Sequence, residues 1–140
     1  MALSMSQLSV GDHRETTLVE DLTRTQIVQY AGSSGDYNPL HTDEVFATQV
    51  AGYPSVFAHG MLTMGITARL LTDWVGDGRL LRYGVRFVKQ VWPGDTLLGR
   101  AEVTAIRETE DGPVADIAVE TRNHNGDLVL SGSASARLDP

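Results

Sequence analysis

The sequence predicts a single α+β domain in which an antiparallel sheet wraps one long apolar helix. In the front half of the chain the apolar residues have helical spacing, whereas the back half alternates apolar and polar residues as strands do. Residues 60–75 form an almost uniformly apolar helical pattern, and such a helix is normally buried. The pattern changes near residues 76–78 without a linker or repeat, so we expect residues 1–140 to be one domain.

The front half begins with a predicted strand around residues 16–20, followed by a capped helix. Thr23 and Gln26 have capping-box spacing, in which both side chains satisfy free backbone amides at a helix start. The glycines that follow are expected to end this helix, immediately before the stretch SGDYNPLH. A shorter helix is predicted over residues 43–49. Its buried side is expected to carry Val45, Phe46 and Val50.

The long helix is followed by a predicted set of strands. Apolar and polar side chains alternate in LLRYGVRFVKQV, and similar alternation returns in three later segments. The apolar face of the first strand is expected to carry Leu81, Tyr83, Val85, Phe87 and Val91. Turn signals at Pro93-Gly94-Asp95, Asp111-Gly112 and Asn125-Gly126 separate the segments. We therefore predict four consecutive strands paired as an antiparallel meander.

Composition argues against several classes of function. The formal net charge is −7 and the pI about 4.9, with no dense Lys/Arg cluster, so neither nucleic acid nor an anionic membrane is expected as a partner. The chain has no cysteine, so neither thiolate catalysis nor cysteine-bound zinc is expected. No apolar run approaches the ~18 residues needed to span a bilayer, and the first residues lack a signal-peptide pattern. We expect a soluble cytoplasmic protein.

The stretch SGDYNPLH, residues 34–41, concentrates polar chemistry in an expected loop between two helices. Asp36 and His41 lie five residues apart around a bend at Pro39, a spacing that allows their side chains to converge. Asp and Asn are also common turn formers, so on these residues alone a purely structural role is an open alternative. A metal site is disfavoured, because the stretch lacks HExxH or paired-histidine spacing.

The second candidate feature is AHGM, residues 58–61, at the predicted start of the long helix. Gly60 would present an unobstructed backbone N–H at a helix N-terminus, where amides lack partners and the dipole is positive. Such a donor can stabilise a developing oxyanion. The alternative is that Gly60 simply begins the helix and that His59 is a surface or cap residue.

Together these features resemble a known family. YAGSSGDYNPLHTDEVFA and FAHGMLTMG are similar to the motifs of the MaoC-like (R)-specific enoyl-CoA hydratases and (3R)-hydroxyacyl-ACP dehydratases. AHGMLTMG and the later WVGD resemble in particular the catalytic subunit of two-subunit hydroxyacyl-ACP dehydratases. The resemblance implies a hotdog fold, in which a sheet wraps a long central helix, usually as a dimer joined sheet to sheet. This fold agrees with the periodicity of the sequence.

The resemblance also implies a mechanism. Asp36 and His41 would hold the water that adds across an α,β-unsaturated thioester, and the Gly60 amide would stabilise the enolate. Asn38 would hold the loop or orient the water. The remaining residues expected to contact substrate are Tyr53, Val56, Phe57 and His59, of which the first three could equally be ordinary core. No metal, nucleotide or flavin is required.

One position departs from the short-chain members of the family. They carry a serine eight residues after the motif glycine, whereas this chain has Ala68. Thr63 or Thr67 could supply the missing hydroxyl, and the sequence does not decide between them. The substitution affects the expected substrate range and rate more than the reaction class.

Two other functions stay open. A hotdog thioesterase is disfavoured because the long helix carries only one carboxylate, Asp73, near its end. A non-catalytic thioester-binding subunit is disfavoured by the intact Asp36–His41 pair. The sequence does not determine whether the carrier is CoA or acyl carrier protein, which acyl chain is bound, or whether the chain forms a homodimer or a heterodimer with another hotdog subunit.

Overall fold

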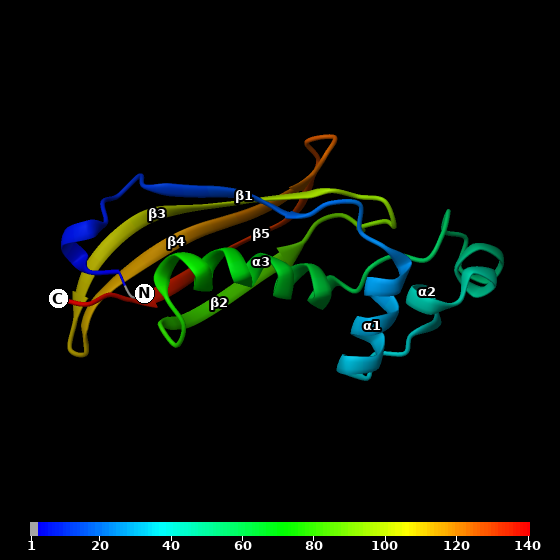
Figure 1. Cartoon of the computed structure of the whole chain (residues 1–140), viewed down its shortest axis with the longest axis horizontal. Helices are drawn as coiled ribbons and strands as arrows, with labels where there is room; N and C mark the ends of the chain where they lie inside the picture. Colours follow the sequence, from blue (N-terminus) through cyan, green and yellow to red (C-terminus); the bar gives the residue numbers. More distant parts are fainter. Residues whose placement is uncertain (1–2) are drawn as a thin grey trace.

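The computed structural model describes residues 3–140, so the first two residues of the predicted domain lie outside the described part. A curved sheet carries one long helix along its concave face (Figure 1). The strands are β1 (His13–Val19), β2 (Leu80–Phe87), β3 (Leu97–Thr109), β4 (Gly112–Asn123) and β5 (Leu128–Arg137). The helices are α1 (Arg24–Ser34), α2 (Pro39–Thr42) and α3 (Gly60–Val75), with a 3₁₀ turn at Met5–Gln7 and a π-helical turn at Phe46–Val50. No helix in residues 3–140 is both long and apolar enough to cross a membrane.

The strands pair antiparallel in the order β1-β3-β4-β5-β2. The predicted four-stranded meander is therefore wrong in one respect: β3, β4 and β5 are consecutive neighbours, but β2 pairs with β5 instead of β3. The connection over residues 88–96 is long enough to cross the sheet end, whereas a tight hairpin would have kept β2 beside β3. Glycine is required at Gly132, because a side chain there would collide with the carbonyl oxygen of Gly84 on β2.

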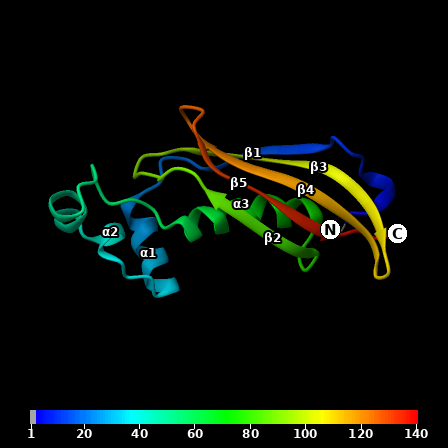
Figure 2. The same cartoon turned by 180° about the vertical axis from the view of Figure 1, so that it is seen from behind.

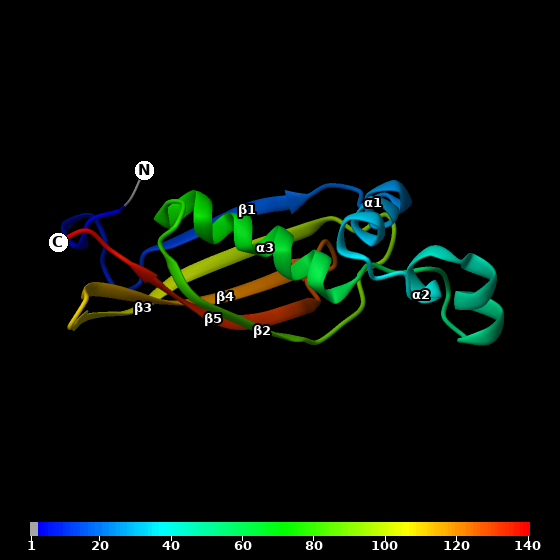
Figure 3. The ribbon, with the colours of Figure 1, turned by 90° about the horizontal axis from the view of Figure 1, so that it is seen from below.

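Helix α3 has the predicted bounds, but it is not buried all round. Its sheet-facing side chains pack into the main core with Val103, Ile117 and Ala134. The buried residues of α3 are Thr63, Thr67, Leu70, Leu71, Trp74 and Val75. The opposite face is uncovered along the length of the helix (Figure 3), and Met61 on it is 56% exposed. One sheet can cover only one side of a helix, so the remaining apolar surface lacks a partner among residues 3–140.

Residues 24–59, which we call the overhang, project beyond the end of the sheet (Figure 2). The predicted capping box is confirmed: Gln26 N donates to Thr23 Oγ1 at 3.1 Å, and Thr23 N donates to Gln26 Oε1 at 2.9 Å. Ile27 anchors α1 in a second apolar cluster that includes Val129 of β5. This cluster attaches the overhang to the sheet.

The predicted short helix of the overhang is present in part, as a turn of helix that continues into the π-helical Phe46–Val50. Its predicted buried side is wrong. Val45 and Val50 are 59% and 70% exposed, Phe46 is half-buried, and Ala47 is the residue that is buried. The segment lies at the tip of the overhang, away from the sheet (Figure 1), so little covers its apolar residues.

Candidate active site

The loop after α1 is shaped by its own side chains. Gly35 ends α1 with a φ of 76°, in the left-handed region that glycine tolerates. Asp36 Oδ1 accepts a hydrogen bond from Asn38 N at 3.2 Å, and Asn38 Oδ1 accepts one from Leu40 N at 3.0 Å. Asn38 thereby caps α2, whose first residue is Pro39. Of the two roles expected for Asn38, holding the loop is the one that its contacts support.

His41 on α2 is buried, and one of its ring nitrogens has no hydrogen-bond partner in residues 3–140. Its Nδ1–H donates to the carbonyl oxygen of Phe57 at 2.6 Å, and because a carbonyl only accepts, Nε2 is left as an unprotonated acceptor. Burial lowers the pKa of His41 below its ordinary 6.5, and the neighbouring His59 acts in the same direction. The Phe57 carbonyl and Asp36 oppose this shift. His41 is therefore arranged as a neutral base.

His59 is one of the most buried side chains of the molecule, so the alternative that it is a surface residue is wrong. It is 1% exposed, and although it occupies the N-cap position of α3, its side chain makes no capping bond. Its ring stacks on that of His41 with centroids 3.8 Å apart, and its Nε2 donates to the Asp36 carbonyl oxygen at 3.0 Å. Nδ1 of His59 has no hydrogen-bond partner in residues 3–140.

Asp36, His41 and His59 place one potential ligand atom each within 4.8 Å of the others. The two imidazoles are nevertheless a poor pair of metal ligands. A ring nitrogen binds a metal in the plane of its ring at about 2.0–2.1 Å. Stacked rings with an interplanar angle of 26° have planes that do not meet at such a short distance. The geometry therefore favours a small hydrogen-bonding molecule between Asp36 and His41 over an ion.

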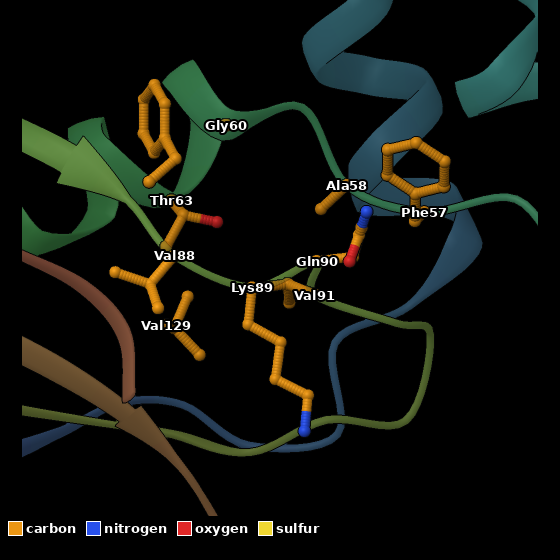
Figure 4. A pocket seen from close by; sticks show the side chains of 10 residues that line it. Phe57, Ala58, Gly60, Thr63, Val88, Lys89, Gln90, Val91 and Val129 are labelled. Atoms are coloured by element: carbon orange, nitrogen blue, oxygen red, sulfur yellow. The ribbon is translucent and has the colours of Figure 1, made fainter. Parts of the chain in front are cut away.

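A cavity of about 290 Å³ opens beside the first turn of α3 (Figure 4). Gly60 and Thr63 form its helix side, and the Thr63 hydroxyl points into it (Figure 4). The other lining residues are Phe57, Ala58, Phe87, Val88, Lys89, Gln90, Val91 and Val129. Most of these are apolar, as expected of a pocket for a largely apolar ligand.

The Gly60 backbone amide makes no hydrogen bond within residues 3–140. It is one of the unpaired donors at the start of α3, as predicted. A side chain at this position would press on Phe87, whose ring atoms would lie 3.1 Å from an added Cβ. Glycine therefore keeps room between the helix start and the aromatic ring that lines the cavity.

Of the residues expected to contact substrate, only some line the cavity. Phe57 lines the cavity, but Tyr53 and Val56 do not. Tyr53 packs against the Phe57 ring at 4.9 Å, and Val56 is buried. Asp36, Asn38 and His41 are not among the residues that line this cavity, and Asp36 and His41 contact His59 instead.

Several lining residues were missed by sequence reasoning. Phe87, Lys89 and Val129 come from β2, the following connection and β5, which the fold brings to α3. No local pattern could have identified them, because their proximity to Gly60 depends on strand order. Thr63, which the sequence already offered as one of two candidate hydroxyls, lies one helical turn after Gly60 and faces the same way.

The two candidate threonines differ in availability. Thr67 Oγ1 donates to the Thr63 carbonyl at 2.9 Å and accepts a hydrogen bond of 2.7 Å from Thr121 Oγ1, so its hydrogen-bonding capacity is used in the core. Thr63 has its hydroxyl in the cavity (Figure 4). Of the two, Thr63 is the one whose hydroxyl reaches the cavity.

Comparison with known proteins identifies the family. The MaoC like domain model matches residues 6–124, and the chain belongs to this family. The fold is the hotdog fold that its structural neighbours share. The (R)-hydratase from A. caviae involved in PHA biosynthesis superimposes with a TM-score of 0.82 and 31% identity, covering 94% of this chain and 97% of that chain.

Relatives of known activity agree with this assignment. The (R)-specific enoyl-CoA hydratase of Aeromonas caviae is 31% identical over 97% of this chain and 99% of its own length. A mitochondrial 3-hydroxyacyl-[acyl-carrier-protein] dehydratase of Arabidopsis thaliana is 32% identical over 96% of this chain and 80% of its own length. The 3-hydroxyacyl-thioester dehydratase Y of Mycobacterium tuberculosis is 44% identical over 56% of this chain, and the match spans only 27% of that longer protein.

Proposed function

We propose that this protein is an (R)-specific hydratase or dehydratase that interconverts trans-2-enoyl and (3R)-3-hydroxyacyl thioesters. The reaction class, a hydro-lyase, follows from membership of the MaoC-like family and from the named activities of its full-length relatives. The observation that supports the residue assignment is that an Asp36 carboxylate oxygen lies within 4.8 Å of a ring nitrogen of His41, whose Nε2 is unprotonated because Nδ1–H donates to Phe57. Both groups accept hydrogen bonds, so a water molecule between them could donate one to each.

In the proposed hydration step, His41 takes a proton from this water as its oxygen bonds to the β-carbon of the substrate. The electron pair of the carbon–carbon double bond moves towards the thioester, whose oxygen becomes an enolate. The free Gly60 amide at the positive end of α3 is the donor for that oxygen. His41 then returns the proton to the α-carbon, so that one water supplies both H and OH to the same face. Dehydration is the reverse.

The cavity beside Gly60 is the proposed site for the part of the thioester next to the reacting carbons. Its apolar walls suit an acyl chain, and the Thr63 hydroxyl would contact a polar group of the substrate near the thioester. Lys89 extends away from the centre of the cavity (Figure 4) and pairs with Asp127 at 2.6 Å. The carrier, CoA or acyl carrier protein, would be bound outside the cavity.

The rival thioesterase reaction has less support. Asp73, the one carboxylate of α3, is exposed and lies in the last turn of the helix, at the opposite end from Gly60. A thioesterase would also need the nucleophilic water directed at the thioester carbon, whereas a water between Asp36 and His41 would attack the β-carbon while Gly60 holds the thioester oxygen.

We further propose that the chain forms a dimer through β2. The two edges of the sheet differ in exposed apolar surface: β2 carries Arg82 and Arg86 but also leaves Leu81 and Phe87 exposed, and Val88 directly after it is exposed too, whereas no large apolar residue of β1 is exposed. An unpaired apolar edge favours pairing with another strand. Two copies of β2 paired antiparallel would continue the sheet around a two-fold axis and help to cover the open face of α3. Solved relatives include heteromers such as the ChsH1-ChsH2 complex, at 23% identity, so a second hotdog subunit could occupy the same edge.

The oligomer is tested by light scattering after gel filtration. A homodimer gives twice the chain mass of 15.2 kDa, and Leu81→Lys should shift it towards the monomer. Val10→Lys is the matched control, because Val10 is at least as exposed as Leu81 but lies far from β2 in the sequence and outside the sheet. A monomer at every concentration would contradict a homodimer and leave the heterodimer with another hotdog subunit.

The function is tested by incubating the purified protein with trans-2-enoyl-CoA substrates of increasing chain length and following loss of the conjugated double bond. We expect hydration of at least one length class, and the same panel reports the acyl preference. Release of free CoA without formation of a 3-hydroxyacyl product would instead indicate a thioesterase. No reaction with any thioester, alone or with a second hotdog subunit, would contradict the proposed function.

A further inference from the structure

The burial of His59 is not explained by the reaction described above. The ring is 1% exposed and lies outside the cavity lining, and neither proton transfer nor enolate stabilisation uses it. A buried polar atom without a partner costs free energy, and Nδ1 of His59 is such an atom within residues 3–140. An apolar side chain of similar size would avoid that cost. The imidazole must therefore do something that an apolar side chain cannot.

The His59 ring contacts both members of the proposed catalytic pair, Asp36 and His41, and its remaining aromatic contact is with Tyr30. Because a carbonyl oxygen only accepts, the 3.0 Å bond to Asp36 fixes the proton of His59 on Nε2. One face of the ring lies against His41 at a centroid distance of 3.8 Å. Tyr30 of α1 meets the ring edge-on at 4.8 Å and 65°. His59 thus contacts the backbone of Asp36 and the ring of His41 at the same time.

Two neighbouring residues hold the pair together. The carbonyl of Phe57 fixes the ring of His41 through Nδ1, and the side chain of His59 fixes Asp36 through its carbonyl. The two histidines therefore carry their protons on different nitrogens. These contacts use the backbone of Asp36 and one edge of His41, and they leave the Asp36 carboxylate and the His41 Nε2 to face a reactant.

We propose that His59 is a positioning residue, which holds the Asp36 backbone through its Nε2–H and the His41 ring plane by stacking, so that the two reacting groups converge. The proposal rests on the proposed function of the Asp36–His41 pair. It gives His59 no proton transfer, because its free Nδ1 is sealed from solvent.

Three substitutions separate the two contacts. His59→Gln keeps an uncharged N–H donor within reach of the Asp36 carbonyl, His59→Phe keeps a flat ring against His41, and His59→Leu keeps neither. We expect His59→Leu to lower kcat about 100-fold, the scale of a small misplacement of reacting groups, with KM changed less than about twofold. His59→Gln and His59→Phe should each recover part of that loss.

The opposite kinetic patterns would overturn the proposal. A raised KM with unchanged kcat would make His59 a substrate-binding residue. Equal losses in all three variants would mean that neither the donor nor the ring matters separately. Thermal melting of each variant identifies loss of folding. His59→Phe is the variant expected to stay folded, because its ring fills the space that the imidazole occupies.

A second readout does not depend on turnover. Long-range ¹H–¹⁵N NMR spectra report which nitrogen of His41 carries the proton. We expect an Nδ1–H tautomer in the wild-type chain and in His59→Phe, and a mixture in His59→Leu because the ring is no longer held. An unchanged His41 spectrum in His59→Leu would contradict positioning. If the wild-type chain hydrates no thioester, the proposed function fails, and the NMR comparison still decides the role of His59.

Discussion

The overhang and the sheet with α3 are held by different kinds of interaction. In the overhang, the loop and the segment before α3 are fixed by single hydrogen bonds, such as those from Leu40 N to Asn38, from His41 to Phe57, and from His59 to Asp36. Between α3 and the sheet, fully buried apolar side chains such as Leu71, Ile117 and Ala136 make one continuous core. The proposed proton-transfer groups lie in the first region.

This difference has a thermodynamic consequence. A core side chain contributes to stability through buried area and close packing, whereas a single hydrogen bond of the overhang contributes a small net free energy but fixes an orientation. Gly60 lies where the two regions join, at the end of the overhang and the start of α3. Substitutions should therefore separate activity from stability according to the region in which they fall.

The largest expected effect is loss of activity from the catalytic pair. Asp36→Asn and His41→Ala should each lower kcat/KM for enoyl-CoA hydration by about 10²–10⁴-fold, because each removes a proton-transfer or water-orienting group. Asp36 is exposed, so Asp36→Asn should leave the melting temperature nearly unchanged. Activity retained in both variants would refute the site assignment.

The converse effect is expected in the core. Ile117→Ala should destabilise the fold by about 2–5 kcal/mol, because it empties a site packed against α3. The remaining folded protein should keep its kcat. Leu98→Ala, at an exposed position of β3, is the matched control and should change stability by less than about 0.5 kcal/mol. Denaturant unfolding measures both, and equal destabilisation by the two changes would argue against the core as described.

A substitution at Gly60, where the overhang joins α3, should lower activity while leaving stability nearly unchanged. Gly60→Ala should lower kcat by about 10- to 100-fold, because the new Cβ presses on Phe87 and displaces the helix start from the thioester oxygen. Alanine favours helix over glycine, so stability should not fall by more than about 1 kcal/mol. Full activity in Gly60→Ala would count against this amide as the oxyanion donor.

The smallest effect is the pH dependence of the catalytic histidine. Burial lowers the pKa of His41 below 6.5, so activity that needs its neutral ring should be constant at higher pH and fall as pH drops through the lowered pKa. The same shift affects stability. The unfolded chain binds this proton more readily, so the contribution of His41 is complete above 6.5 and lost as pH falls through the folded-state pKa. A pH–rate profile with its acidic limb above 6.5 would contradict a lowered pKa.

The two regions also differ in how well the sequence predicts them. Helical periodicity gives the bounds of α3, and the capping-box spacing locates the start of α1. Strand order was not predictable from local pattern, because pairing of β2 with β5 depends on a long connection. The exposure of Val45 and the open face of α3 were missed for a related reason. Apolar periodicity identifies the apolar face of a helix, but it does not show whether other residues of the chain pack against that face.

In the candidate site, the motif residues were predictable and their neighbours were not. SGDYNPLH indicates Asp36 and His41 directly, and Asn38 acts as the turn former that its residue type suggests. The burial of His59 depends on contacts with residues far earlier in the chain, such as Asp36 at 23 positions, and no periodicity carries that information. The cytoplasmic location stays a prediction, and the acyl chain was not predicted from the sequence.

The central claim is that one water held by Asp36 and His41 adds across the double bond opposite the Gly60 amide. The most direct test is hydration of a trans-2-enoyl-CoA in ²H₂O, with the configuration at both reacting carbons determined by NMR and chiral chromatography. We predict a (3R)-3-hydroxyacyl-CoA with one deuterium at the α-carbon, on the face that received the hydroxyl. A (3S) product, or deuterium on both faces of the α-carbon, would contradict the account.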